Sequence, residues 1–292
     1  MMKKILITGA NSYVGTSFEK HLRQWPERYH VDTVGMVDGT WREKSFRGYD
    51  AVFHVAGIVH MEKSKTDPGQ AELYDRVNTR LAIETAQKAR DDGVKQFVFM
   101  SSASVYGLSA PVGKVVMITK DTPVNPVDNY GISKAKAEEG IRALADKGFK
   151  TVFLRPPTVY GKGCKGNYVT LSKLAKALPV FPKVENQRSM LYIDNLSEIV
   201  RLVIDNEDEG IICPQNNEYV STCEMVDLIA KANGKRILMV PGFGWALKLL
   251  SHATYLVDKA FGSLCYDREV SRYSQDYCIK NFSDSVMETE KL

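Results

Sequence analysis

Lys4-Ile5-Leu6-Ile7-Thr8-Gly9-Ala10-Asn11-Ser12-Tyr13-Val14-Gly15 is the stretch that decides the fold. Its first five residues are mostly apolar and β-branched and predict a strand, and apolar residues recur at helical spacing after Gly15. Strand, glycine turn and helix in this order present the amides of a helix N-terminus to a pyrophosphate. Gly9 allows the tight turn and Gly15 allows close helix–strand packing, but Ser12 stands where such loops usually carry a middle glycine. The stretch therefore predicts either a dinucleotide-binding loop or a structural turn.

The chain up to about residue 160 alternates between strand and helix patterns. In chain order these are strands at 31–37 and 50–57, a helix at 73–89, a strand at 97–100, a helix at 128–147 and a strand at 151–154. This alternation predicts an α/β fold, a Rossmann-type doubly wound parallel sheet with helices on both faces. The pattern weakens after residue 160, so a smaller mixed α/β domain is expected in the C-terminal part. Residues 108–125 are expected to be a surface excursion.

Tyr130 and Lys134 stand four residues apart at the start of the helix predicted over 128–147. On a helix these positions share one face, about 5–6 Å apart at Cβ, so the phenol and the ammonium point into the same space. A lysine cation beside a phenol favours the phenolate and lowers the pKa of the tyrosine toward the working pH of a general acid–base. An ordinary solvated helix turn has the same spacing, so the pair needs support from the rest of the chain.

Asp38 follows the second strand pattern, where an acid can accept hydrogen bonds from an adenosine ribose and repel a 2′-phosphate. It lies farther from Gly9 than the usual offset of about 20 residues. Arg42 follows closely and could instead bind a 2′-phosphate. NAD is therefore favoured as the cofactor, and NADP stays open.

Composition argues against several classes of protein. Of 292 residues, 44% are apolar and 25% charged, as in soluble globular proteins. The net charge of +4 is spread without a basic block, which argues against nucleic acid. Five cysteines without CxxC spacing, and histidines without metal-ligand spacing, argue against disulfides or a metal and fit a reducing compartment. No run reaches the ~18 apolar residues of a membrane-spanning helix. We therefore expect the protein to lie in the cytoplasm.

Residues 243–264 form an amphipathic stretch with few cations on its polar face. Helices that lie on a membrane surface are usually rich in lysine and arginine there. We therefore expect this stretch to pack on a domain or a partner, and membrane-surface binding is the alternative.

Five motifs occur in a fixed order along the chain: TGANSYVG at 8–15, FHVAG at 53–57, SSASVYG at 101–107, YGISK at 130–134 and LRPPTVYG at 154–161. Together they resemble the extended short-chain dehydrogenase/reductases. Within these, the chain is similar to the NAD-dependent epimerase/dehydratase family acting on nucleotide sugars, of the UDP-galactose 4-epimerase type. The resemblance covers residues 3 to about 205. It implies an NAD(P)-binding Rossmann domain at 1–160 plus about 195–212, and a nucleotide-sugar-binding domain at 161–194 and 213–292.

The resemblance also implies a role for each matching residue. Ser102 would hold the sugar oxygen, Tyr130 would be the acid–base, and Lys134 would support it and hold the nicotinamide ribose. Asn167 and Arg188, with Ser102, would bind the substrate, the first two at its diphosphate. The implied cofactor-binding residues are Gly9, Asn11, Ser12, Tyr13, Val14, Gly15, Asp38, Ala56, Gly57, Asn78, Tyr130, Lys134 and Pro157. No metal is implied.

The reaction implied by the resemblance is that of an NAD(P)-dependent nucleotide-sugar 4-epimerase, which oxidises and re-reduces C4 of a UDP-hexose through a 4-keto intermediate. A 4-ketoreductase of a UDP-(N-acetyl)-deoxy-4-keto-hexose in polysaccharide biosynthesis is the alternative. A 4,6-dehydratase is disfavoured, because Ala103 and Ser104 stand where that enzyme has an Asp–Glu pair. A catalytically silent NAD(P)-binding regulator would not need the serine, tyrosine and lysine. The resemblance further implies a homodimer formed through helices at 71–90 and 128–147.

Overall fold

The structure is a computed structural model that describes residues 2–59, 68–243 and 255–291. It divides into two compact units, each made of three chain segments. The first consists of Met1–Gly107, Pro123–Pro156 and Ser197–Cys213, and the second of Leu108–Thr122, Pro157–Leu196 and Pro214–Leu292. The segment Leu108–Thr122 thus belongs to the second unit, although it was expected within the first domain. Which ligand each unit binds stays a prediction.

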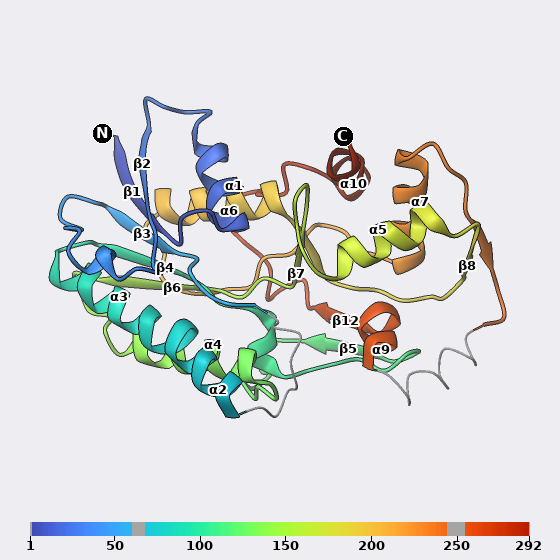
Figure 1. The fold of residues 1–292 in the computed structure, drawn as a ribbon, viewed down its shortest axis with the longest axis horizontal. Coiled ribbons are helices and arrows are strands. Elements are labelled where there is room, and N and C mark those ends of the chain that lie inside the picture. Colours follow the sequence, from blue (N-terminus) through green and yellow to red (C-terminus); the bar gives the residue numbers. More distant parts are fainter. Residues whose placement is uncertain (1, 60–67, 244–254, 292) are drawn as a thin grey trace. The chain divides into compact units, whose positions relative to one another are not determined.

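A six-stranded sheet forms the centre of the first unit, and every neighbouring pair of its strands is parallel (Figure 1). Its order is β10-β6-β4-β3-β1-β2. The bounds are β1 (Lys3–Thr8), β2 (Tyr29–Val34), β3 (Ala51–His54), β4 (Gln96–Met100), β6 (Lys150–Leu154) and β10 (Gly210–Ile212). The order reverses between β1 and β3, and such a reversal opens a ligand-binding crevice beyond the carboxyl ends of the strands.

Helices cover both faces of this sheet (Figure 1). One face carries α1 and α6, and the other carries α4 and the helix formed by α2, η2 and α3. The bounds are α1 (Tyr13–Leu22), α2 (Pro68–Tyr74), the π-helical turn η2 (Asp75–Arg80), α3 (Leu81–Asp91), α4 (Asn129–Arg142) and α6 (Ile193–Asp205), with short 3₁₀ turns η1 (Thr40–Arg42) and η3 (Ala103–Tyr106). Helices on both faces bury the strands on both sides, which explains their continuous apolar runs. The predicted doubly wound parallel sheet is confirmed.

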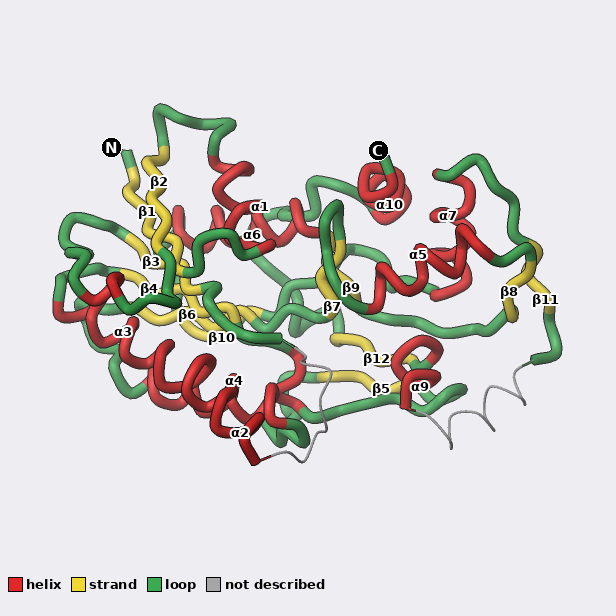
Figure 2. Tube along the Cα trace, in the orientation of Figure 1, coloured by secondary structure: helices red, strands yellow, loops and turns green. Residues whose placement is uncertain are grey.

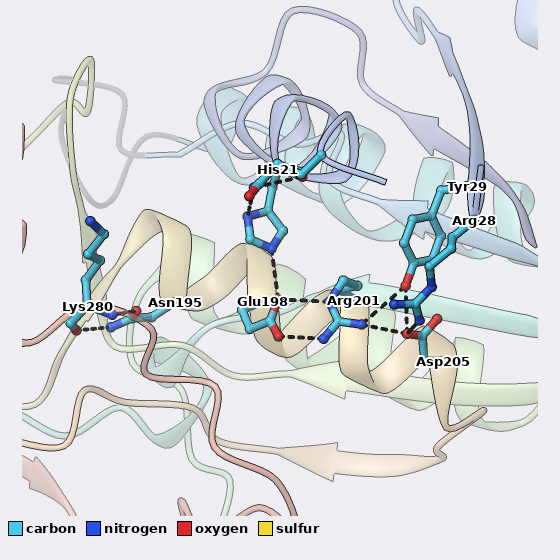
Figure 3. Close-up of polar contacts among 9 residues, drawn as sticks. His21, Arg28, Tyr29, Asn195, Glu198, Arg201, Asp205 and Lys280 are labelled. Carbon is cyan, nitrogen blue, oxygen red and sulfur yellow. Dashed lines mark hydrogen bonds and ion pairs between the residues drawn. The ribbon is translucent and has the colours of Figure 1, made fainter. Parts of the chain in front are cut away.

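A chain of buried and half-buried polar contacts joins α6 to α1 and β2 (Figure 3). Nε2 of His21 lies 2.9 Å from Oε2 of Glu198. Arg201 bonds Glu198 over 2.6 Å and Asp205 over 2.7 Å. Asp205 in turn accepts a 2.7 Å hydrogen bond from the hydroxyl of Tyr29. One charge network therefore holds α6 to α1 and β2, which lie far from it in the sequence.

The second unit is mixed α/β, as predicted. Figure 2 shows its strands as short segments, which pair as three two-stranded parallel sheets. The pairs are β5 (Val115–Ile118) with β12 (Ser263–Tyr266), β7 (Thr158–Tyr160) with β9 (Met190–Tyr192), and β8 (Val180–Pro182) with β11 (Leu238–Val240). Its helices are α5 (Asn167–Ala177), α7 (Thr222–Ala232), α9 (Tyr255–Phe261) and α10 (Phe282–Glu290). Of the amphipathic stretch at 243–264, residues 244–254 lie outside the described residues.

Strand β5 lies within the surface excursion expected over 108–125 and was not predicted. Its partner β12 comes much later in the chain, and the two pair in register from Val115 with Ser263 to Ile118 with Tyr266. Val115 and Met117 are exposed while Ile118 is buried. The segment is too short and too exposed to show a strand pattern without its partner.

Candidate active site

The glycine loop after β1 lies against the ends of two neighbouring strands. The amides of Gly9 and Ala10 donate to the carbonyl oxygen of Val34, at the end of β2, over 2.9 and 3.1 Å. Gly9 has a φ of +99°, and a Cβ there would lie 2.9 Å from the backbone nitrogen of Ala56. A residue without a side chain is required for both reasons. Gly9 therefore places bare backbone against Ala56 beyond the carboxyl ends of β1 and β3, the edge at which ligands bind in sheets of this type.

Ser12 begins helix α1 at the other end of this loop. Its hydroxyl oxygen accepts a 3.1 Å hydrogen bond from the amide of Gly15, an N-cap that satisfies one amide of the first turn. The hydroxyl can still donate its proton to a phosphate oxygen. Asn11 before it is exposed with a φ of +66°, and Tyr13 and Val14 form the first turn of the helix. The donor set and the bare backbone fit a pyrophosphate.

Asn78 supports the loop that follows β3. Its fully buried side chain accepts from the amide of Ile58 over 2.8 Å and donates to the carbonyl of Ile58 over 3.0 Å and to Oγ of Ser133 over 3.1 Å. A Cβ at Gly57 would lie 3.0 Å from Oδ1 of Asn78 and 3.5 Å from Nζ of Lys134. Asn78 lies in the π-helical turn η2, a feature frequent at functional sites. The structure therefore brings together Gly57, Asn78 and Lys134, and their role in binding the cofactor stays a prediction.

Tyr130, Lys134 and Ser102 also lie together. Asp128 caps helix α4 by accepting from the amide of Gly131 over 2.7 Å, which starts the helix just before Tyr130. Nζ of Lys134, buried with 4% of the residue exposed, donates to the carbonyl of Met100 over 2.8 Å. The side chain of Ser102 hydrogen-bonds with the half-buried Tyr130. A phenol, a hydroxyl and an ammonium thus meet at the carboxyl end of β4.

The pKa of Tyr130 in this structure is raised, and the expectation that Lys134 lowers it is wrong for the protein alone. Burial raises the pKa of Tyr130 to about 12, the hydrogen bond with Ser102 opposes the rise, and the charge of Asp128 adds to it. Burial also lowers the pKa of Lys134 to about 8, against the attraction of Glu138. Desolvation dominates both groups, because it disfavours the charged form of each.

Asp38 and Arg42 lie near one another after β2 but make separate contacts. The exposed carboxylate of Asp38 accepts from the amide and the hydroxyl of Thr40 over 3.1 and 2.8 Å. Nε and Nη2 of Arg42 donate to the two oxygens of Glu84 over 2.5 and 2.7 Å. Nη1 of Arg42 would lie 3.3 Å from a Cβ placed on Gly39. The negative charge of Glu84 therefore offsets the positive charge of Arg42, the cation nearest to Asp38 along this segment.

The remaining candidates belong to the second unit. Pro157 follows the boundary between the units, and Asn167 is the exposed first residue of α5. The backbone of Arg188 pairs with that of Val220 over 2.8 and 3.0 Å. Burial lowers the pKa of the Arg188 guanidinium, and no carboxylate in the described part of the chain lies within ion-pairing distance of it. A desolvated guanidinium in this state favours an anionic ligand.

The comparison with known proteins assigns the chain to a family. Residues 5–214 match the sequence profile described as the NAD dependent epimerase/dehydratase family. The chain belongs to the NAD-dependent epimerase/dehydratase family. The resemblance inferred from the five motifs is therefore confirmed.

Individual relatives differ in their reactions. The chain is similar to a UDP-glucose 4-epimerase of Vibrio cholerae, with 33% identity over 91% of this chain and 88% of the relative. It is also similar to a UDP-2-acetamido-2,6-beta-L-arabino-hexul-4-ose reductase of Pseudomonas aeruginosa, with 25% identity over 90% of this chain and 67% of that protein. A crystal structure of UDP-glucuronic acid 4-epimerase from Bacillus cereus in complex with NAD matches its fold, with a TM-score of 0.74, 18% identity, and 98% and 96% coverage of the two chains.

This epimerase/dehydratase family member has site residues that the sequence did not single out. Ser101, Glu138 and Arg155 form a buried polar cluster beside Ser102. Glu138 lies one helical turn after Lys134 on α4, so its spacing was a usable signal. No pattern in the sequence indicated that Arg155, at the end of a buried strand, is its partner.

Two structural features were not found among the described residues of this family member. Across 2–59, 68–243 and 255–291, no helix is long and apolar enough to cross a membrane. The same ranges contain no group of three or more histidine, cysteine, aspartate or glutamate residues that could hold a metal ion.

Proposed function

We propose that this protein is an NAD-dependent nucleotide-sugar 4-epimerase, which oxidises and re-reduces C4 of a UDP-hexose through a 4-keto intermediate. The observation that carries this proposal is the meeting of Ser102, Tyr130 and Lys134 at the carboxyl end of β4. The bare backbone of Gly57 lies beside them. A Cβ placed on Gly57 would be 3.5 Å from Nζ of Lys134. This arrangement supports proton transfer next to the nicotinamide ring of the proposed cofactor.

Each of the three residues has a distinct role in the proposed reaction. Tyr130 takes the proton of the C4 hydroxyl and later returns it, while Ser102 holds the C4 oxygen. Lys134 supports the phenolate by its charge and binds the nicotinamide ribose. A nicotinamide bound there would supply the reversible hydride acceptor for C4. Because the pKa of Tyr130 is raised to about 12 in the protein alone, the positive charge of an oxidised nicotinamide would help to form the phenolate.

The cofactor would lie across the crevice between β1 and β3. Gly9, Asn11, Ser12 and the first turn of α1 would hold the pyrophosphate. Asp38 would accept from the adenosine ribose, Ala56 and Gly57 would line the cofactor, and Pro157 would contribute backbone at the nicotinamide. The pairing of Arg42 with Glu84 supports NAD over NADP, because a guanidinium already bound to a carboxylate attracts a 2′-phosphate less strongly.

The substrate would be held at its diphosphate by Arg188 and Asn167. A guanidinium binds phosphate oxygens through two parallel hydrogen bonds, and that of Arg188 has no carboxylate partner among the described residues. Burial lowers the pKa of this guanidinium, because it is costly to keep a cation out of water. A diphosphate would offset that cost, which supports this role.

A 4-ketoreductase acting on a UDP-(N-acetyl)-deoxy-4-keto-hexose is the second candidate. It is favoured by the similarity to the reductase of Pseudomonas aeruginosa over 90% of this chain. The same three residues would serve, with Tyr130 donating its proton to a 4-keto oxygen as hydride arrives from the reduced cofactor. Such an enzyme needs fresh reduced cofactor in every turnover, whereas an epimerase does not.

Purified protein should therefore be incubated with UDP-glucose or UDP-N-acetylglucosamine and no added reductant. Formation of the 4-epimer, read by NMR or chromatography, supports the epimerase. Oxidation of reduced cofactor only when a 4-keto sugar is supplied supports the reductase. NAD that copurifies with the protein points to the epimerase, because that enzyme regenerates its cofactor within each cycle.

The role of Tyr130 is tested by Tyr130→Phe, with Tyr49→Phe as the matched control. We expect the first to abolish turnover and leave the Kd for NAD within about threefold, since one hydroxyl is lost from an otherwise intact site. Tyr49, whose hydroxyl bonds Asp32 over 2.6 Å, should retain turnover when changed. Unchanged turnover in Tyr130→Phe would refute the catalytic assignment. Absence of all turnover in the unaltered protein, with NAD still bound, would favour the silent regulator.

We also propose that the protein is a homodimer that uses the helices at 71–90 and 128–147. Light scattering of the purified protein tests this, and a monomer at micromolar concentration would contradict it.

A further inference from the structure

A buried ion pair lies directly behind the proposed catalytic residues, between Glu138 of α4 and Arg155, which follows β6. Nε of Arg155 donates to Oε1 of Glu138 over 2.9 Å, and its Nη2 donates to Oε2 over 2.5 Å. The side chains are only 4% and 5% exposed. Removing two charges from water is costly, and apolar side chains of similar volume often stabilise a core equally well. Stability alone therefore does not account for the pair.

The ion pair holds both ends of the segment that carries Ser102. Oγ of Ser101 donates to Oε1 of Glu138 over 2.5 Å. Nη1 of Arg155 donates to the hydroxyl of Tyr106 over 2.9 Å, and its guanidinium lies 5.1 Å from the centre of the Tyr106 ring. Ser101 precedes Ser102, and Tyr106 ends the 3₁₀ turn η3 that Ser102 begins. Both anchors of the Ser102 turn thus converge on one carboxylate and one guanidinium.

Lys134 lies one helical turn before Glu138 on the same helix. The charged and titratable groups that interact electrostatically with its ammonium are Glu138 on α4 and His54 on β3. His54 is neutral, because burial and the Lys134 charge lower its pKa to about 3. Glu138 attracts the ammonium and opposes the loss of its proton. One carboxylate therefore contacts the serine segment and also acts on the lysine.

We propose that Glu138 and Arg155 are positioning residues, which fix Ser102 and the Lys134 turn of α4 in one arrangement for proton transfer. This inference rests on the proposed function, because neither side chain is assigned a contact with the substrate. It adds to that function the requirement that the ionic pair itself, and not only a filled core, is needed for catalysis.

The test compares Glu138→Gln, the double variant Glu138→Met/Arg155→Met, and the control Glu139→Gln, which alters the exposed neighbour on α4. Glu138→Gln leaves the Arg155 charge buried without a countercharge, so we expect a lower urea midpoint. We also expect kcat to fall about 10-fold or more, as for a misplaced reacting group, with KM and the Kd for NAD within about threefold. Glu139→Gln should match the unaltered protein in urea midpoint and in kcat.

The double variant separates positioning from folding. It buries no charge, so its urea midpoint should recover toward that of the unaltered protein. Its kcat should stay low, because Ser101 and Tyr106 have lost their shared partners. If kcat recovers together with the midpoint, the pair only stabilises the fold and the proposal is overturned.

A second measurement does not depend on turnover. The pKa of Lys134 can be followed by NMR of protein with ¹³C-labelled lysines, with the resonance assigned through Lys134→Met. Loss of the neighbouring anion in Glu138→Gln should lower this pKa, and Arg155→Met, which leaves Glu138 without its cation, should raise it. Glu139→Gln should leave it unchanged. Shifts of equal sign in the two cluster variants would contradict the proposal.

Failure of the positioning role can be distinguished from failure of the proposed function. If Tyr130→Phe retains turnover, the catalytic assignment itself fails. If Tyr130→Phe abolishes turnover while Glu138→Gln keeps kcat, only the positioning role is refuted.

Discussion

Lys134 donates its hydrogen bond to the carbonyl oxygen of Met100, 2.8 Å away, and no acid among the described residues forms an ion pair with it. The ring of Phe99 lies 4.6 Å from the same ammonium. A backbone dipole and an aromatic face together compensate only part of the cost of burying a lysine, so its pKa falls to about 8. The residue thus lowers the stability of the fold, which is consistent with the role proposed for it in catalysis.

Replacing Lys134 by methionine should therefore stabilise the protein and abolish turnover. A fall in pKa from 10.5 to about 8 corresponds to about 3 kcal/mol, and loss of the bond to Met100 returns roughly 1–1.5 kcal/mol of it. We expect the free energy of unfolding at pH 7 to rise by about 2 kcal/mol, measured by urea denaturation.

The pH dependence checks the cause of this stabilisation. Between pH 8 and 10.5 the folded state has lost the lysine proton and the unfolded state keeps it, so the stability of the unaltered protein rises with pH. The advantage of Lys134→Met should shrink over that range. A constant advantage would show that packing, and not charge burial, is responsible.

Gly9→Ala should damage the cofactor site, and Gly35→Ala is its matched control. At Gly9 a Cβ would meet Ala56 at 2.9 Å on a backbone with a φ of +99°. We expect unfolding to become easier by about 2 kcal/mol and NAD binding, measured by calorimetry, to weaken at least tenfold. A Cβ at Gly35 meets nothing within 4 Å, so that variant should stay within about 0.5 kcal/mol. Normal NAD affinity in Gly9→Ala would remove the loop from the site.

Glu84→Gln should shift cofactor preference toward NADP. The change releases the guanidinium of Arg42, which Glu84 now binds through two hydrogen bonds. We expect the ratio of the calorimetric Kd values for NADP and NAD to fall about 3- to 10-fold, the size of an exposed charge effect. Glu72→Gln makes the same change of charge at the exposed pair with Arg80 and should leave the ratio unaltered. Equal ratios in both variants would show that Arg42 lies away from the 2′ position.

The network in Figure 3 predicts how the protein responds to acid. Burial alone would raise the pKa of Glu198, but hydrogen bonds from Arg201 and His21 lower it to about 2 from an ordinary value of 4.5. A lowered carboxyl pKa gives stability that is present above pH 4.5 and lost as the pH falls toward 2. This contribution to the free energy of unfolding is about 3 kcal/mol. Glu198→Gln should lose that amount at pH 7 and show a flatter decline below pH 4.5, whereas an unchanged acid profile would exclude the network as its source.

The sequence predicted the sheet well, because local patterns encode it. Continuous apolar runs identified β3 and β4, and the glycine at position 9 identified the turn, since each signal depends on a few adjacent residues. The placement of Tyr130 and Lys134 in the first turns of α4 followed from local helix signals alone. These features need no knowledge of distant partners.

Features that depend on distant residues were missed. Strand β5 forms only through β12, and Glu138 becomes part of the site only through Arg155. The pKa of Tyr130 was expected to fall, yet burial by the surrounding chain raises it to about 12. Desolvation is a property of the packed structure, so a spacing of four residues does not reveal it.

The division of the first unit into three chain segments has a consequence for synthesis on the ribosome. Strand β10, at Gly210–Ile212, pairs with β6, and Gln96 donates to the carbonyls of Val203 and Asp208 over 3.0 and 2.9 Å. At about 5–20 residues per second, the nascent sheet waits several seconds for these partners, with one edge of β6 unpaired. A gene fragment ending at residue 156 would make this exposed edge permanent, and exposed edges promote aggregation. The protein is thus expected to complete its sheet only after two of the three segments of its second unit have been translated.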